Sequence, residues 1–494
     1  MTEAEALAAA PRRLLVDGGW RDAADGATMP VDDPATGDEL AAVADGGPAD
    51  ALDALAAAAA AQPRWSARPP RERAEALRGL FEEMRAAREG LALLLTLEMG
   101  KPLAESREEV DYAAEYLRWF AEEAVRIEGG YAPSPDGRSR ALVMKAPAGP
   151  GLVITPWNFP LVTATREIGP ALAAGCTLVL KPAPETPLAT LVLAECALRA
   201  GLPSGVLNVV TTSDPAAVTG ALIDDGRLRV LAFTGSTAVG RELIARSADR
   251  ALRLSMELGG NAPFLVFADA DLDAALDGAM TAKTRNLGES CTAANRFLVD
   301  REVADEFAQR LADRMAELRM GRGTEEGVEV GPLIDVEKAT SVEELVADAV
   351  ARGATLLTGG TRPPGPGTFF PPTVLAGVPP DARILREEVF GPVAPITTFA
   401  GEDDAVAAAN ATDYGLAAYV YTRDLDRALR VAEHLQVGMV GLNRGVVSNV
   451  AAPFGGMKRS GFGRKGGREG IEEWLETKYV AMPAPVPPEP AATP

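Results

Sequence analysis

The chain of 494 residues is long enough for about three domains of roughly 150 residues, or for two larger ones. Apolar residues make up 47% of it and charged residues 24%, a balance that excludes a fibrous or wholly disordered protein. Asp and Glu outnumber Lys and Arg by 70 to 49, and the net charge of −21 argues against partners such as nucleic acid or an anionic membrane.

The first residues, from Met1 to Glu5, lack the basic and apolar stretches of a secretory signal, and no uncharged apolar run of 18 residues follows. We therefore expect a cytoplasmic protein. Three cysteines, Cys176, Cys196 and Cys291, are too few and too scattered for a disulfide framework. The single histidine, His434, excludes a histidine-rich metal site, and no metal is expected.

Charges spaced by three and four positions in an alanine-rich background predict helices over residues 49–125. Short apolar runs separated by helix-sized segments follow, and they predict the strands of a parallel sheet covered by helices. These runs are 152–155, 177–180, 206–210 and 230–233.

A second series begins after residue 260, with strands expected at 264–267 and 297–299 and helices at 270–285 and 302–318. The fold class is therefore α/β, with two doubly wound domains of parallel sheet.

Two glycine-rich segments are candidates for phosphate binding. The G-x-G-x-x-G of residues 461–466 follows a polar stretch and not a strand, so a loop is expected there. The apolar run 230–233 instead leads into Gly235 and a helix that Ser236 or Thr237 could cap, which leaves N–H groups free to face an anion. Such a turn is also common as a tight connection without a ligand.

Three side chains are candidates for chemistry. Cys291 is a nucleophile if a helix N-terminus, a cation or a base lies beside it, because a free thiol is only a few per cent thiolate at neutral pH. Glu257, at the end of an apolar stretch before a flexible Gly-Gly pair, is a candidate base. Asn158, between two prolines, suits a fixed hydrogen-bond donor, although it could equally satisfy its own turn. Cys176 and Cys196 are expected to be packing residues.

Six segments in one order along the chain resemble the aldehyde dehydrogenase superfamily, and the resemblance spans about residues 15 to 480. They are 155–160, 233–237, 256–261, the stretch around Cys291, 387–392 and 453–458. Within the superfamily the chain is most similar to the succinate-semialdehyde dehydrogenases, through residues 115–123, Arg285 with Asn286, and 447–449.

The resemblance implies that Cys291 attacks an aldehyde to give a thiohemiacetal, with its oxyanion held by the Asn158 side chain and the Cys291 N–H. Hydride transfer to nicotinamide leaves a thioester, which Glu257 hydrolyses by activating water. In the same way it assigns the pyrophosphate to Ser236 and the adenine ribose to Lys181. The nicotinamide ribose is assigned to Glu388 and Phe390. The full set of implied cofactor-binding residues is Lys181, Trp157, Ser236, Gly235, Glu388 and Phe390.

Cofactor choice follows from charge. Many NAD-preferring relatives carry a glutamate three positions after the lysine, where it would repel a 2′-phosphate, but this chain has Pro184 there. We therefore expect NADP as the cofactor, with NAD as the alternative if Glu185 turns towards the ribose.

The substrate expectation depends on anion recognition. Arg166, Arg285 and Ser448 fall where the similar semialdehyde enzymes hold the substrate carboxylate, and arginine suits a carboxylate in a chain of this net charge. Each residue alone has another explanation; Arg285, for example, could pair with Glu289. Glu289 itself replaces the glutamine usual in the family, and we expect its charge to disfavour a thiolate at Cys291.

The resemblance also implies the domain boundaries: 12–126 with 147–257 for dinucleotide binding, 258–469 for catalysis, and a small β oligomerisation arm from 127–146 with 470–482. A homodimer or homotetramer is expected, and the Pro-rich residues 483–494 are expected to be disordered.

The predicted function is therefore NAD(P)-dependent oxidation of succinate semialdehyde to succinate. Two kinds of alternative stay open: another aldehyde such as glutarate semialdehyde, since one methylene cannot be read from sequence, or a cofactor-independent thiol esterase that uses Cys291 and Glu257. A non-catalytic assembly protein is the third reading, against which the three candidate side chains argue.

Overall fold

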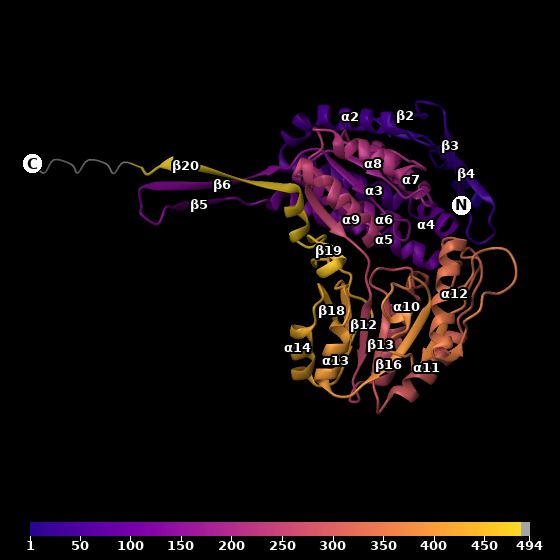
Figure 1. Ribbon diagram of the computed structural model, residues 1–494. Coiled ribbons are helices and arrows are strands. Elements are labelled where there is room, and N and C mark those ends of the chain that lie inside the picture. The colour runs from indigo at the N-terminus through magenta and orange to yellow at the C-terminus, as the bar shows by residue number, and fades with distance from the viewer. Residues whose placement is uncertain (486–494) are drawn as a thin grey trace, which may run out of the picture.

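The computed structural model describes residues 1–485 and consists of two α/β units, one above the other in Figure 1, and a long β arm. The chain begins in a short helix, α1 (Glu3–Ala9), and a β-ribbon, β3 (Thr28–Asp32) with β4 (Glu39–Ala44). The tail predicted over 483–494 lies outside the described residues, except for its first three positions, and Pro483 is still part of a strand.

The first unit is built on an eight-stranded sheet in the order β19-β11-β10-β7-β8-β9-β1-β2. Its five central strands are parallel, and four of them have mainly apolar sequences that are buried on both faces, as helices on both sides of a sheet require. The five are β7 (Gly151–Ile154), β8 (Leu178–Lys181), β9 (Leu207–Val209), β10 (Val230–Thr234) and β11 (Arg253–Glu257). The fifth, β11, is Arg-Leu-Ser-Met-Glu, and its first two residues are half-buried.

Helices cover this sheet, and four of them come from the segment 49–125 in which the sequence predicts helices. Those four are α2 (Pro48–Ser66), α3 (Pro70–Ala86), α4 (Arg88–Met99) and α5 (Leu103–Glu123). The crossover helices between the strands are α6 (Pro160–Ala174), α7 (Leu188–Arg199), α8 (Pro215–Asp224) and α9 (Thr237–Ser247).

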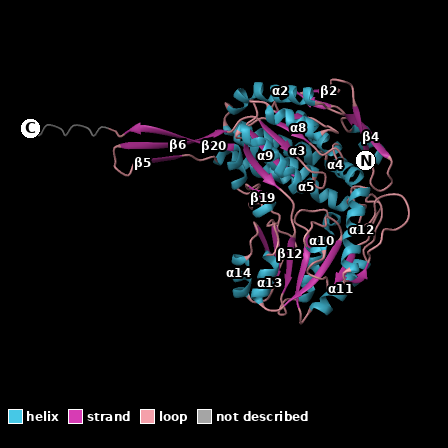
Figure 2. Ribbon diagram, in the orientation of Figure 1, coloured by secondary structure: helices cyan, strands magenta, loops and turns pink. Residues whose placement is uncertain are grey.

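The second unit has a seven-stranded sheet in the order β14-β15-β16-β13-β12-β17-β18, parallel except for β14. The strands are β12 (Ala262–Val266), β13 (Ala294–Asp300), β14 (Thr355–Thr358), β15 (Thr373–Ala376), β16 (Val393–Phe399), β17 (Ala417–Tyr421) and β18 (Met439–Leu442). Helices flank it in Figure 2: α10 (Leu272–Thr284), α11 (Ala304–Ala316), α12 (Val336–Ala351), α13 (Glu402–Asn410) and α14 (Leu425–His434).

The arm is an antiparallel sheet that extends away from both units (Figure 1). Its central strand, β6 (Ser139–Pro147), pairs along its whole length with β20 (Leu475–Pro483) and over four residues with β5 (Gly130–Pro133). The C-terminal strand therefore begins at Leu475, because residues 469–474 form a short helix that packs on α6.

The predicted α/β class, with two mainly parallel sheets and a small β arm, is confirmed. The sheets are mixed and not purely parallel, because β1 (Leu14–Val16), β2 (Gly19–Arg21) and β19 (Gly461–Phe462) add antiparallel strands at the edges of the first one. Gly461 and Phe462, where a loop was expected, form that last short strand. Within the described part of the chain, no helix is both long and apolar enough to span a bilayer.

Candidate active site

One cavity of about 590 Å³ lies between the two α/β units, and all twelve residues singled out from the sequence line it. Its first wall is formed at the carboxyl ends of β7, β8, β10 and β11, the usual place for a ligand in a doubly wound sheet. Its second wall comes from loops of the second unit. The twelve residues are Trp157, Asn158, Arg166, Lys181, Gly235, Ser236, Glu257, Arg285, Cys291, Glu388, Phe390 and Ser448.

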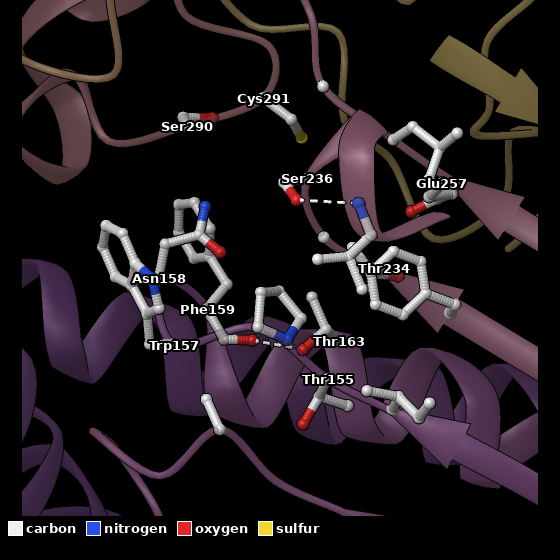
Figure 3. Close-up of a pocket in the computed structure, with 18 of the residues that line it drawn as sticks. Thr155, Trp157, Asn158, Phe159, Thr163, Thr234, Ser236, Glu257, Ser290 and Cys291 are labelled. Carbon is white, nitrogen blue, oxygen red and sulfur yellow. Dashed lines mark hydrogen bonds between the residues drawn. The ribbon is translucent and has the colours of Figure 1, made fainter. Parts of the chain in front are cut away.

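Three of these side chains face one space. In Figure 3 Cys291 reaches in from its loop, with Asn158 on one side and Glu257 on the other. Asn158 lies in the connection between β7 and α6, while Glu257 ends β11. The first unit thus supplies an amide donor and a carboxylate, and the second unit supplies the thiol.

The Cys291 loop has an unusual backbone. Asn286 and Leu287 both have positive φ angles, 53° and 60°, and Gly288 follows at 73°. This sharp turn ends the helical segment and sends the chain back towards the first unit. The linker between β11 and β12 passes so close behind the cysteine that a β-carbon on Gly260 would overlap the carbonyl oxygen of Cys291. The Gly-Gly pair therefore permits close approach and is not simply flexible.

The resting thiol of Cys291 is protonated at neutral pH. Burial raises its pKa to about 12, the negative charges of Glu257 and Glu388 add to the rise, and Arg166 opposes it. A nucleophile of this kind needs a base at the moment of reaction, and Glu257 lines the same space.

The expectation that Glu289 disfavours the thiolate is wrong. Its carboxyl group is fully buried, with Oε1 accepting a hydrogen bond of 3.1 Å from the Ile334 N–H, and it is not among the main charges that shift the pKa of Cys291. Burial raises the pKa of Glu289 well above its usual value. Arg285, which could have paired with Glu289, instead lies with its guanidinium 5.4 Å from the centre of the Phe159 ring.

Arg166 and Glu257 form a buried ion pair, with the nearest nitrogen and oxygen 3.4 Å apart. The guanidinium also lies 4.1 Å from the centre of the Phe454 ring. The Nε of Arg166 and the Oε1 of Glu257 are buried with no hydrogen-bond partner among residues 1–485. Each group therefore has one buried polar atom whose hydrogen-bonding capacity is unused in this structure.

The far end of the cavity suits an anion. Ser236 caps α9 as predicted, its Oγ accepting a bond of 3.4 Å from the Val239 N–H, and Ser236 and Val239 at this helix start line the cavity. Lys181, at the end of β8, is buried, and its burial lowers the pKa to about 8. Pro184 lines the cavity next to it, whereas Glu185 is not among the lining residues.

Between these two ends lie Glu388 and two aromatic rings. The Oε1 of Glu388 accepts a bond of 2.9 Å from the Gly260 N–H, and burial raises the pKa of this carboxyl group to about 7. The rings of Trp157 and Phe390 meet edge to face with centres 5.3 Å apart. A carboxylate beside aromatic faces can hold sugar hydroxyls and a flat ring.

The sequence did not single out several other lining residues. Lys338 lies near Phe390, and Tyr112 and Phe454 lie near Arg166, while Arg246 lines the end of the cavity beyond Ser236. Arg246 was detectable because it is one more cation on the helix that begins at the glycine turn. Phe454 lies in the segment 453–458, which resembles the family, although no role is assigned to it from the sequence; nothing local marks Lys338.

Comparison with known proteins gives a consistent result. Residues 20–480 match the model of the aldehyde dehydrogenase family. A succinate-semialdehyde dehydrogenase of Paenarthrobacter nicotinovorans is 56% identical, over 90% of this chain and 99% of that protein. A glutarate-semialdehyde dehydrogenase of Pseudomonas aeruginosa is 50% identical, over 95% of this chain and 97% of that protein. The crystal structure of an NADP-dependent enzyme of E. coli superimposes with a TM-score of 0.95 at 48% identity, covering 96% of this chain and 98% of that one.

Proposed function

The chain belongs to the aldehyde dehydrogenase family, and on that basis we propose that it oxidises succinate semialdehyde to succinate with NADP+. The observation that carries the choice of substrate is the presence of Arg166, Arg285 and Ser448 in the same cavity as Cys291. Arg166 already has Glu257 as an anionic partner, whereas Arg285 is half-buried and forms no ion pair within residues 1–485, so its guanidinium is available to a substrate carboxylate.

The first step joins the thiol to the aldehyde. Glu257 takes the proton of Cys291 as the sulfur attacks the aldehyde carbon, and a thiohemiacetal forms. The Nδ2–H of Asn158 and the backbone N–H of Cys291 stabilise the oxyanion. The cofactor supplies a hydride acceptor for the carbon that the sulfur holds.

The second step releases the acid. Glu257 first releases the proton of Cys291 to solvent and then takes a proton from the water molecule that hydrolyses the thioester. Release of the acid returns the thiol to its protonated form, which burial favours.

The residues present fit a dinucleotide. Ser236 and the start of α9 would hold the pyrophosphate, Gly235 gives the chain room to turn, and Lys181 would meet the adenine ribose. Glu388, Phe390 and Trp157 would hold the nicotinamide end near Cys291. A cavity that runs from Cys291 to Lys181 is longer than an esterase needs for an acyl group.

A substrate test compares Arg285→Ala and the parent on succinate semialdehyde and on butanal, which has no carboxylate. We expect kcat/KM to fall by about a hundredfold for the semialdehyde and by less than threefold for butanal, since a charge-assisted contact to a carboxylate is worth about 1.5–3 kcal/mol. Equal losses on both aldehydes would overturn the proposed carboxylate clamp. Formation of reduced nicotinamide, followed by its absorbance, also excludes the esterase.

Glutarate semialdehyde is the second candidate substrate, because a relative named for that activity is 50% identical. The two substrates differ by one methylene, a difference worth about 1–3 kcal/mol in a fitted pocket. Comparing kcat/KM for aldehydes of both chain lengths decides between them.

The choice of NADP over NAD is supported by Pro184 and Lys181 at the cavity wall and by the NADP-dependent relative. Replacing Pro184 by glutamate puts a carboxylate where a 2′-phosphate would lie. Pro184→Glu should raise the KM for NADP by tenfold or more and leave the KM for NAD similar or lower. An unchanged KM for NADP would contradict this placement of the ribose.

We also propose that the chain forms a homodimer or homotetramer through the arm, and that it acts in the cytoplasm. The arm supports the first statement because β5 and β20 are edge strands that neither unit covers. The three free thiols are consistent with the second.

A further inference from the structure

The loop that carries Asn158 and the loop that carries Cys291 are joined by one buried side chain. The Nδ2 of Asn286 donates to the carbonyl oxygen of Asn158 at 3.2 Å and to the carbonyl oxygen of Glu289 at 2.9 Å. The side-chain Nδ2 of Asn158 donates to that same Glu289 carbonyl at 2.9 Å. Asn286 thus bridges the main chains of both loops, and the Asn158 amide is fixed between them.

A second buried group fixes the Asn158 loop from behind. The Nζ of Lys101 donates to the Asn158 carbonyl oxygen at 2.8 Å and forms an ion pair of 2.5 Å with Glu109. Both side chains are almost wholly inaccessible to solvent. The other oxygen of Glu109 accepts from the N–H groups of Leu161 and Val162, at the start of α6. One buried ion pair therefore secures the loop and the helix that follows it.

The Cys291 loop is held from the same element. Glu105, one helical turn before Glu109 on α5, accepts a bond of 2.6 Å from the Asn286 N–H. The beginning of α5 thus holds Asn286 through Glu105 and holds the Asn158 loop through Glu109 and Lys101. No residue of this set lines the cavity except Asn158, so the set acts on the site only through what it positions.

We propose that Asn286 and Lys101 are positioning residues that fix the Asn158 amide as an oxyanion donor. We call them, with Glu105 and Glu109, the Asn158 clamp. The inference rests on the proposed function, because it presupposes that Asn158 stabilises the oxyanion.

The hydrogen bonds support Asn158 as the donor to the oxyanion and Asn286 as the residue that positions it. An amide group has two N–H bonds, and the Glu289 carbonyl takes one from Asn158, which leaves the other for the substrate oxygen. Donors aimed before the reaction begins are effective because no reorganisation is needed in the transition state. Without Asn286 the Glu289 carbonyl and the Asn158 loop lose their common partner, and the donor is less well aimed.

The decisive experiment is a double-mutant cycle between Asn286→Gly and Asn158→Ala. Glycine keeps the left-handed backbone that Asn286 adopts, at a φ of 53°, and removes only the side chain. In the parent, Asn286→Gly should lower kcat about tenfold, leave the KM for NADP unchanged and leave the alkylation rate of Cys291 by iodoacetamide unchanged. In the Asn158→Ala background it should lower kcat by less than twofold.

A matched control is Asp17→Gly. Asp17 also has a positive φ, 52°, but lies in the turn between β1 and β2 at the far edge of the first sheet. This change should leave kcat unaltered in both backgrounds. Melting temperatures of all variants show whether the fold is retained.

The outcomes separate the clamp from the proposed function. An equal loss from Asn286→Gly in both backgrounds, or no loss in the parent, overturns the clamp alone. Full activity of Asn158→Ala overturns both the oxyanion role and the clamp. If Asn286→Gly does not fold, the same cycle is run with Lys101→Met/Glu109→Gln, which removes both charges of the pair together.

Discussion

At the scale of single residues, the protonation of Cys291 determines how the reaction begins. Burial and the charge of Glu257 raise the pKa of this thiol, while Arg166 lowers it. The thiol is therefore unreactive until a base acts on it, and the two groups that control it are themselves an ion pair. A protein with this arrangement is protected from adventitious thiol chemistry when no substrate is bound.

Alkylation of Cys291 by iodoacetamide should therefore be slow at pH 7 and rise about tenfold for each pH unit up to at least pH 10, because only the thiolate reacts. Glu257→Gln removes a negative charge near the sulfur, so it should lower the thiol pKa and speed alkylation at every pH in this range. Mass spectrometry of the modified peptide measures both rates. A plateau below pH 9 in the parent would contradict the raised pKa, and Cys291→Ser serves as the blank.

Lys181 predicts a second pH dependence, that of the KM for NADP, because its positive charge is lost as the pH rises. Burial lowers its pKa to about 8. The lysine is charged below that pH and loses its charge as the pH rises through it, so its attraction for a 2′-phosphate is lost on the alkaline side. The KM for NADP should rise between pH 7.5 and 9.5 while the KM for NAD changes little. Lys181→Arg, which stays charged, should remove the difference; parallel changes for both cofactors would exclude Lys181 as the phosphate partner.

All twelve residues that the sequence singled out line the cavity, and ten of them belong to short segments whose pattern resembles the family; Arg166 and Lys181 lie outside those segments. The prediction from the sequence failed at Glu289, where proximity along the chain was taken for proximity in space. Two residues before Cys291, the turn through Asn286 and Leu287 has already reversed the chain, and the carboxyl group faces Ile334. Nor could the sequence show that Lys101 and Asn286 meet at the Asn158 carbonyl, since 185 positions separate them (286 minus 101).

At the scale of elements, parallel strands were predictable and edge strands were not. Central strands such as β7 and β8 have continuous apolar sequences because both of their faces are covered. Such a run can be recognised in the sequence without knowing which strands lie beside it. Strands β1, β2 and β19 have only two or three residues each and pair at an edge, so their composition carries no such signal. The linker between β11 and β12 is different again, since its glycines are required by what packs against them.

Gly260→Ala tests that linker. A β-carbon there would overlap the carbonyl oxygen of Cys291, so the cysteine loop must shift. We expect kcat to fall by a hundredfold or more, because a displacement of about 1 Å is enough for such a loss, and stability to fall by about 1–3 kcal/mol. Gly47→Ala is the matched control, since a β-carbon at Gly47 meets no atom within 4 Å. Full activity of Gly260→Ala with an unchanged melting temperature would show that the cysteine loop accommodates the added methyl group without a functional shift.

At the scale of the whole molecule, the site exists only where the two α/β units meet. Cys291, the proposed nucleophile, comes from one unit, and Glu257, Asn158 and the helix start at Ser236 come from the other. This division explains why no single motif sufficed to identify the chemistry. The proposed clamp adds contacts from the start of α5 to loops of both units, through Glu105 to Asn286 and through Lys101 to Asn158.

The arm gives the last prediction. Tyr131 and Met144 are 63% and 44% exposed, and the strand register places them on one face of the arm. An antiparallel ribbon of three strands with open edges and exposed apolar side chains gains little by standing alone, so a second copy of the chain is expected to cover it. Tyr131→Asp/Met144→Asp should reduce the molar mass measured by light scattering to that of a smaller assembly or the single chain.

The matched control for this change uses two exposed apolar residues outside the arm. Leu425 and Leu429 are 68% and 50% exposed and lie on α14, a helix of the second unit (Figure 1). Leu425→Asp/Leu429→Asp introduces the same charge and should leave the molar mass unaltered. If both double variants keep the parent's mass, the arm is not the assembly surface; if both lose it, added charge and not the arm is responsible. Loss in the arm variant alone, with the melting transition of the individual units retained, would place the contact between copies on this face.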